Sequence, residues 1–199
     1  MKKAFLVLFL ALISLAIHNS VSYAAYWETF IFPLSDLDHW KAYKWGINYN
    51  LQPNEIITRA RMGFHNINDW QIEEDYIYVR LLGAATPAGV TTYNDNQNNF
   101  NDYFDTSAFR PNRLLFTYSD NNGNTPEDFI YPFTRREVEL LNMAIADGNF
   151  GFGIDPDCHY DTDGIGFQFH KEIIPEPTTL SLLGLGLLGL MGRRFKKRG

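Results

Sequence analysis

Residues 56–64 read Ile-Ile-Thr-Arg-Ala-Arg-Met-Gly-Phe, and an alternation with a period of two runs through them. Successive side chains of a β-strand point to opposite faces, so this period predicts a half-buried strand. The predicted buried face carries Ile56, Thr58, Ala60, Met62 and Phe64. Arg59 and Arg61 are expected on the opposite face.

The same alternation recurs in six other stretches, at 26–32, 45–51, 75–82, 113–119, 149–154 and 164–170. Turn-forming Gly, Pro, Asn and Asp residues separate them. The predicted inward residues of four stretches are Trp45; Ile77, Val79 and Leu81; Leu114, Phe116 and Tyr118; and Ile165, Phe167 and Phe169. Short strands at this spacing, with 16% aromatic residues to fill the space between layers, predict a mostly-β fold of β-sandwich or jelly-roll type.

One amphipathic helix is predicted over residues 135–147. Thr134 and Glu137 have the spacing of a capping box, in which each side chain satisfies a free backbone donor of the first helical turn. Val138, Leu141 and Ile145 follow on one stripe, which should pack on a sheet. Gly148 is suited to the left-handed conformation that ends a helix.

The charge of the chain is unevenly distributed. Its 199 residues carry a net charge of −6, but residues 25–174 contain ten Lys and Arg against 22 Asp and Glu, a net charge of −12. This segment of 150 residues is long enough for one domain with its own core. Its acidity argues against nucleic acid as a partner. A single cysteine excludes an intrachain disulfide framework and a Cys-rich zinc module.

Residues 1–24 have the three parts of a secretory signal peptide. Two lysines follow Met1, an apolar run covers residues 4–17, and small residues precede a cleavage site after Ala24 or Ala25. The apolar run is shorter than the ~20 residues that a spanning helix needs. The expected partners of this segment are the export machinery and signal peptidase, and residues 25–174 form the expected mature domain.

Residues 175–199 contain three further elements in order. Pro175-Glu176-Pro177 comes first, then an apolar, Gly-spaced segment over 178–192, then a basic cluster over 193–198. The apolar segment predicts a short helix in lipid, and the basic cluster predicts a cytoplasmic end by the positive-inside rule. The expected topology is transient anchoring in the inner membrane with the mature domain outside the cytoplasm.

This order of elements resembles the PEP-CTERM sorting signal of Gram-negative bacteria that make extracellular polysaccharide. The resemblance implies recognition by an exosortase, a membrane-embedded cysteine transpeptidase that would cut near Pro175-Glu176-Pro177. The mature domain would then be released or transferred to the cell surface. The resemblance concerns traffic alone, because the domains that carry this signal are diverse.

The densest polar cluster of the mature domain lies between two predicted strands. It contains Asp155, Asp157, Asp161 and Asp163. Crowded carboxylates repel one another unless a cation neutralises them, so these four are the predicted ligands of a Ca²⁺ ion, and no other cofactor is predicted. The alternative is that they form turns through hydrogen bonds to their own backbone.

Cys158 and His159 raise two further alternatives. A nucleophilic pair is disfavoured because adjacent side chains on an extended segment point in opposite directions. A zinc site formed by Cys158, His159, His170 and an aspartate lacks a recognisable ligand spacing. No catalytic residue is therefore predicted. Trp40 and Trp70 lie near turn sequences and are the candidates for stacking on sugar rings.

Three functional hypotheses remain. The first is a non-catalytic, surface-sorted protein associated with exopolysaccharide or extracellular matrix. The second is a secreted hydrolase that acts on glycans through carboxylates the sequence does not identify. The third is a Ca²⁺-stabilised adhesion or carbohydrate-binding module.

Overall fold

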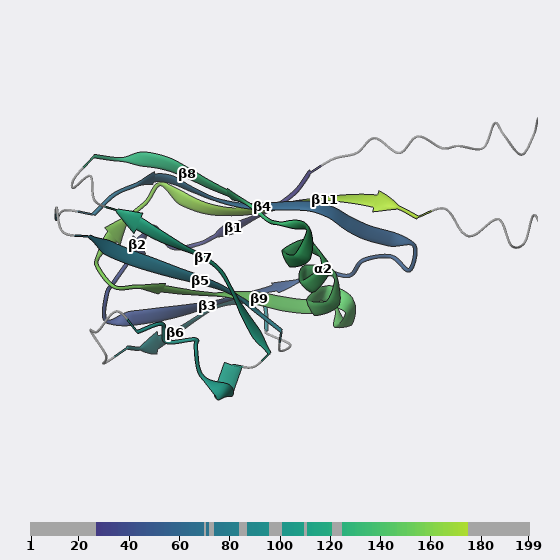
Figure 1. The fold of residues 1–199 in the computed structure, drawn as a ribbon, viewed down its shortest axis with the longest axis horizontal. Helices are drawn as coiled ribbons and strands as arrows, with labels where there is room; N and C mark the ends of the chain where they lie inside the picture. The colour runs from purple at the N-terminus through teal and green to yellow at the C-terminus, as the bar shows by residue number, and fades with distance from the viewer. Residues whose placement is uncertain are drawn as a thin grey trace, which may run out of the picture.

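The computed structural model describes residues 27–69, 71, 74–83, 87–95, 101–109, 111–120 and 125–174. They form two main antiparallel sheets that lie one above the other in Figure 1. The upper sheet has the order β1 (Trp27–Phe32), β11 (Gly164–Ile173), β4 (Glu55–Ile67), β8 (Glu127–Pro132). The lower sheet has the order β6 (Gly89–Asn94), β3 (Lys41–Asn48), β9 (Asn149–Pro156), β5 (Asp75–Leu82), β7 (Asn112–Asp120). A two-stranded sheet pairs β10 (Tyr160–Asp161) with β2 (Asp36–Leu37), and the mostly-β prediction is confirmed.

The core between the two layers is largely aromatic. The ring centroids of Phe152 on β9 and Phe167 on β11 are 4.8 Å apart, and those of Phe32 on β1 and Trp45 on β3 are 5.5 Å apart. All four side chains are buried. Burial of a large apolar side chain contributes ~1.5–3 kcal/mol, so such cross-sheet pairs are a major source of cohesion between the layers.

The predicted alternation is confirmed in β5 and β11. Their inward side chains Ile77, Val79, Leu81, Ile165, Phe167 and Phe169 are all buried. Strand β3 begins at Lys41, earlier than the sequence predicts, and it ends at Asn48. Trp45 lies in the core as expected.

In β4 the predicted inward and outward faces are wrong at the start of the strand, at Ile56 and Thr58. Arg59 pairs with His170, but Ile57 pairs with Lys171, so Thr58 is an extra residue in the strand. Such a β-bulge reverses the phase of the alternation. Ile57 is therefore in the core with 1% of its surface exposed, whereas Ile56 and Thr58 are only partly buried.

Strand β7 contains a second irregularity of this kind. Phe116 pairs with Val79 and Leu114 with Arg80, which leaves Leu115 as the extra residue. Leu115 is buried, and the predicted core residue Leu114 is 37% exposed. The inward positions of Phe116 and Tyr118 are confirmed.

The helix forms where the sequence predicts it. Helix α2 (Arg135–Ala144) begins with the capping box, in which Glu137 accepts the Thr134 backbone N–H at 2.7 Å. A 3₁₀ turn, η2 (Ile145–Asp147), continues it to Gly148, whose φ of 83° is left-handed. The predicted stripe of Val138, Leu141 and Ile145 is buried.

Asn142 joins this helix to the bulge of β4. Its side-chain oxygen accepts the backbone N–H of Ile57 at 2.9 Å, and its side-chain nitrogen donates to the Ile57 carbonyl at 2.9 Å. One amide side chain thus satisfies both backbone groups of Ile57, next to the extra residue Thr58.

The two ends of the chain fall outside the described residues. These are the predicted signal peptide at 1–24 with its cleavage site at Ala24 or Ala25, and the sorting segment at 175–199 with its apolar part at 178–192. Within the described ranges, no helix combines the length and apolar composition that crossing a membrane requires.

We expect Asn142→Ala to lower the free energy of unfolding by ~1–3 kcal/mol, because it leaves two buried backbone groups without partners. The neighbouring Met143 is 73% exposed, so Met143→Ala serves as the control and should change stability little. Urea denaturation of the full-length protein measures both. Equal effects of the two substitutions would contradict this role of Asn142.

Candidate functional site

The candidate site lies on the outer face of the five-stranded sheet and comprises Tyr76, Tyr78, Asp155 and Asp157. Because Ile77 and Val79 point into the core, Tyr76 and Tyr78 point outward, and their ring centroids are 6.3 Å apart at an interplanar angle of 29°. Asp155 pairs with Tyr78 across the β5–β9 register. The backbone N–H of Asp157 donates to the Tyr76 carbonyl at 2.8 Å.

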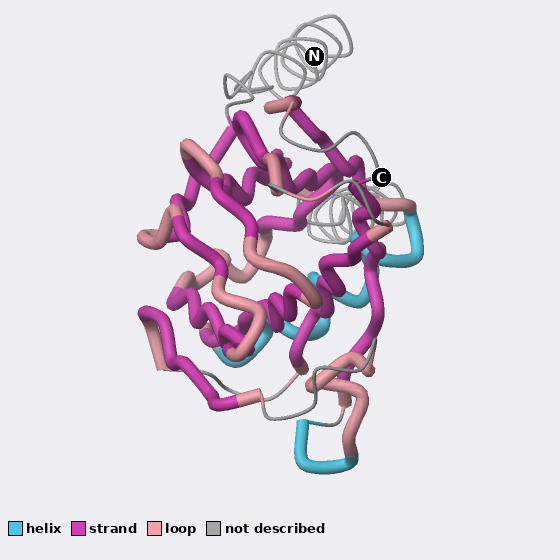
Figure 2. Tube along the Cα trace, turned by 90° about the vertical axis from the view of Figure 1, so that its left-hand side faces the viewer, coloured by secondary structure: helices cyan, strands magenta, loops and turns pink. Residues whose placement is uncertain are grey.

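Residues 101–109, which include the 3₁₀ turn η1 (Ser107–Phe109), cover the adjoining part of this sheet. In Figure 1 and Figure 2 this segment lies on the side of the five-stranded sheet that faces away from the four-stranded sheet. Its Phe104 is fully buried in a small second core with Ala42 and Leu82. A Cβ atom at Gly153 would lie 2.6 Å from the Phe104 ring, so glycine at this position of β9 permits the close contact.

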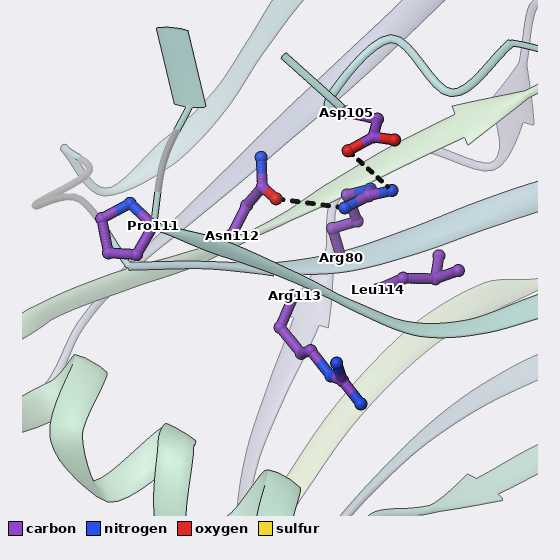
Figure 3. A pocket seen from close by; sticks show the side chains of 6 residues that line it. All are labelled: Arg80, Asp105, Pro111, Asn112, Arg113 and Leu114. Atoms are coloured by element: carbon purple, nitrogen blue, oxygen red, sulfur yellow. Dashed lines mark hydrogen bonds and ion pairs between the residues drawn. The ribbon is translucent and has the colours of Figure 1, made fainter. Parts of the chain in front are cut away.

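Arg80 fastens this covering segment to the sheet. Its guanidinium makes ion pairs with Asp102 and Asp105, and it donates to the Asn112 side chain at 3.1 Å. It lies in a surface pocket of about 570 Å³, drawn in Figure 3, whose other lining residues are Asp105, Pro111, Asn112, Arg113 and Leu114. Two carboxylates already neutralise Arg80, so its role is to position the 101–109 segment rather than to bind an anion.

Burial changes the acid–base behaviour of Asp155. Its Oδ2 accepts the Tyr103 backbone N–H at 2.7 Å, and within the described part of the chain its Oδ1 has no hydrogen-bond partner. Burial first, and then the charges of Asp95, Asp102 and Asp157, raise the pKa of Asp155 to about 8. At neutral pH this carboxyl group therefore holds a proton.

Asp157 has a similar environment but is only partly buried. Burial, followed by the charges of Asp75, Asp95 and Asp102, raises its pKa to about 7. A carboxyl group with this pKa exchanges its proton near neutral pH, and it can both donate and accept a hydrogen bond. Perturbed acids of this kind are concentrated at functional sites, and here they lie beside two tyrosine rings.

The structure does not bring the four predicted Ca²⁺ ligands together. Asp155 and Asp157 belong to the outer face, whereas Asp161 is exposed at the end of β10 and Asp163 is exposed on the β10–β11 connection. Asp163 contacts the side chain of Asn66. Among described residues, three groups of possible ligand atoms lie within 4.8 Å of one another: Asp38, His39 and His159; Asp36, His159 and Asp161; and Asp69, Asp75 and Cys158.

Cys158 and His159 point in different directions, as their adjacency predicts. Cys158 is buried, and burial together with a hydrogen bond to Asp75 raises the pKa of its thiol to about 12. Since the thiolate is the nucleophilic form, this thiol is unsuited to attack. His159 lies 3.1 Å from Asp36, while His170 contacts Thr58 at 3.0 Å, so the zinc set with both histidines is not assembled.

Of the two tryptophan candidates, the structure describes Trp40. Trp40 is 46% exposed, and its ring lies beside that of His39 with centroids 4.7 Å apart. Trp70 falls outside the described residues. Tyr76, Tyr78 and Arg80 are not among the site residues predicted from the sequence. The alternation in 75–82 places their side chains on the outward face, but it does not indicate that the 101–109 segment covers part of this face.

Comparison with known proteins identifies the C-terminal segment. The chain carries a PEP-CTERM protein-sorting motif. The match covers residues 174–197 and confirms the resemblance inferred from Pro175-Glu176-Pro177 and the segments that follow. The motif identifies an exported substrate that an exosortase recognises and that is sorted to the cell surface. No curated protein matches the chain.

We expect Asp155→Asn to stabilise the protein at high pH. The folded-state pKa of Asp155 lies above its ordinary value of about 4, so its contribution to stability falls as pH rises from about 4 to about 8. Asparagine resembles the protonated form and avoids this loss. The melting temperature should rise by several degrees relative to wild type at pH 9, at roughly 2–4 °C per kcal/mol, and far less at pH 4.

Asp161→Asn is the matched control, because Asp161 is an exposed aspartate at the end of β10. Thermal melts of both variants at the two pH values provide the measurement. If Asp155→Asn shifted the melting temperature equally at pH 4 and pH 9, the assignment of a retained proton to Asp155 would be incorrect.

Proposed function

We propose that the chain is a non-catalytic surface protein with a β-sandwich domain that binds extracellular polysaccharide after exosortase processing. The PEP-CTERM motif at residues 174–197 carries this proposal, because it directs the protein to the cell exterior. The outer face supports it chemically. Aromatic rings stack on the apolar faces of sugars, and a partly buried carboxyl group that exchanges its proton near neutral pH, as that of Asp157 does, can both donate a hydrogen bond to a hydroxyl group and accept one.

The position of the motif relative to the fold suits processing. Strand β11 ends at Ile173, and the Ile174 N–H donates to the Asn54 carbonyl at 2.7 Å. A cut near Pro175-Glu176-Pro177 would therefore remove no strand, and signal-peptide cleavage after Ala24 or Ala25 would leave β1 intact. Before the cut, residues 178–192 would anchor the chain transiently in the inner membrane with residues 193–198 in the cytoplasm.

The described chain starts and ends at the same end of the sandwich. Trp27 pairs with His170, near the end of β11. The first residue of β9 pairs with the end of β3, and this is the end of the sandwich at which the described chain starts and stops. Tyr76 instead adjoins the last residues of β9. The outer face therefore lies toward the opposite end. Trp40, just before β3, lies at the opposite end too. A protein held through its C-terminal side would thus present Tyr76, Asp157 and Trp40 outward.

Two other functions remain as proposals. The raised pKa of the partly buried Asp157 favours a glycan hydrolase as the second candidate, since a general acid must hold a proton near the working pH. Stabilisation by Ca²⁺ at Asp155, Asp157, Asp161 and Asp163 also stays a prediction, although it would require these residues to move together.

Substitution of all three residues of Pro175-Glu176-Pro177 by alanine should block processing. The uncut protein should then accumulate in the inner-membrane fraction, while wild type appears at the cell surface with its tail removed. Intact-mass spectrometry of each cell fraction measures this, with Thr178→Ala/Thr179→Ala as the adjacent control. Normal trimming of the triple variant would show that these residues do not direct the cut.

The double variant Tyr76→Ala/Tyr78→Ala should lose most polysaccharide binding, by roughly tenfold for each 1.4 kcal/mol of lost stacking. Pull-down on the polysaccharide of the producing cells measures binding. Trp27→Ala is the control, because Trp27 is an exposed aromatic ring at the opposite end of the fold. Unchanged binding of the tyrosine variant would remove the outer face as the binding surface.

Hydrolysis is tested separately from binding. Incubation with a polysaccharide panel should release no reducing ends if the protein is non-catalytic. Release that disappears in Asp157→Asn, while pull-down persists, would establish the hydrolase instead.

A further inference from the structure

A second acidic cluster lies inside the fold, at the end of the core away from Trp27. Asp75 on β5 pairs directly with Asp120 on β7, and both are buried. Asp69, also buried, follows β4 and approaches this pair, with its backbone N–H 3.4 Å from Asp120 Oδ2. Like charges at directly opposite positions of two strands repel, and burial strengthens the repulsion. This arrangement favours occupation by a cation.

Cys158 completes a set of possible ligand atoms. One carboxylate oxygen each of Asp69 and Asp75 and the sulfur of Cys158 all lie within 4.8 Å of one another. In a tetrahedral site with bonds of 2.0–2.3 Å, neighbouring ligand atoms are roughly 3.3–3.8 Å apart. An ion bound by all three ligand atoms would hold them at this spacing.

The hydroxyl group of Tyr160 is an independent indication of a ligand. Tyr160 is fully buried, and its hydroxyl oxygen has no hydrogen-bond partner within the described part of the chain. Cys158 and Tyr160 are both buried, whereas His159 between them is only partly buried, so the side chains of Cys158 and Tyr160 lie on the same, inner side of this segment. A buried hydroxyl without a partner is costly unless another group occupies the space it faces.

We propose that Asp69, Asp75 and Cys158 bind a divalent metal ion of the zinc class, on the inner side of the segment where the Tyr160 hydroxyl is also buried. The thiol distinguishes this class of ion from Ca²⁺, which takes six to eight oxygen ligands. Two carboxylates and one thiolate carry three negative charges, of which the ion offsets two. Binding requires the Cys158 thiol to release its proton to solvent, so affinity rises with pH.

The proposed ion would join two neighbouring segments, around Asp69 and Asp75, to Cys158, which is distant from both in sequence. It would tie the end of β4 and the start of β5 to the connection between β9 and β10. The same connection contributes Asp157 to the outer face. Asp157 directly precedes Cys158, and its backbone N–H donates to the Tyr76 carbonyl. The site is structural and stands independently of polysaccharide binding.

Co²⁺ titration of the full-length, detergent-purified and chelator-treated protein tests the proposal. We expect one equivalent to bind with a sulfur-to-cobalt charge-transfer band and the intense visible bands of tetrahedral cobalt. Zn²⁺ should displace the cobalt and raise the melting temperature, since an ion bound only by the folded state stabilises it. Absence of the sulfur band, or stabilisation by Ca²⁺ but not by Zn²⁺, would overturn the assignment.

Adjacent substitutions provide matched variants. Cys158→Ser should abolish the sulfur band and weaken Zn²⁺ binding at least about a hundredfold, while His159→Ala should retain both. His159 belongs to the two other groups of possible ligands, so this pair separates the buried site from a surface site. Loss of the Zn²⁺-dependent melting shift in His159→Ala but not in Cys158→Ser would assign zinc to the surface and refute the proposal.

Two further variants keep the test decisive if Cys158→Ser does not fold. Asp75→Asn should weaken Co²⁺ binding strongly, and Asp120→Asn by about tenfold, as for a residue next to the ligands. Tyr160→Phe removes the buried hydroxyl and should leave the metal-free protein at least as stable as wild type. Full Co²⁺ affinity in Asp75→Asn would exclude Asp75 as a ligand and overturn the proposed set.

Discussion

The contact between Phe152 and Phe167 joins the two sheets near their centres, and the rest of the arrangement depends on it. Phe152 belongs to β9, whose inner face carries large rings and whose outer face carries Gly153. The inner rings hold the layers together, while the missing side chain outside lets Phe104 lie directly on the strand. The 101–109 segment then supplies the Tyr103 N–H that binds Asp155. One strand thus links core cohesion to the chemistry of the outer face.

Buried acids lie on both sides of the sheet near the end of β9. On the outer side, Asp102 is paired with Arg80, and Asp155 responds to burial with a raised pKa. On the inner side, Asp69, Asp75 and Asp120 meet beside Cys158. Charges removed from water are stabilised by a paired charge, by protonation or by a metal ion. The fold shows the first two of these solutions on the outer side, and our proposal assigns the third to the inner side.

The sorting signal and the folded domain occupy separate parts of the chain. The match to the motif begins at Ile174, immediately after the last strand ends at Ile173. This separation has a physical basis, because a segment that a membrane enzyme must reach cannot also be hydrogen-bonded within a sheet. The address can therefore be recognised from a short local sequence, whereas the function of the domain depends on groups that only folding assembles.

The sequence by itself determined the features that depend on neighbouring residues. The capping box of Thr134 and Glu137, the end of the helix at Gly148 and the inward faces of β5 and β11 all follow from local spacing. The C-terminal sorting motif is local in the same way. Each of these signals is contained in one short local segment and needs no knowledge of the partner strands.

The tertiary structure alone decided where the alternation changes phase and which acids meet. The bulge at Thr58 depends on the register with β11 and on Asn142, which is 85 positions from Ile57. The acidic loop was visible in the sequence, but Asp155 and Asp157 separated from Asp161 and Asp163. Cys158 instead met Asp69 and Asp75. Strand pairing brings together residues far apart in sequence, and a one-residue shift in register moves a side chain to the other face.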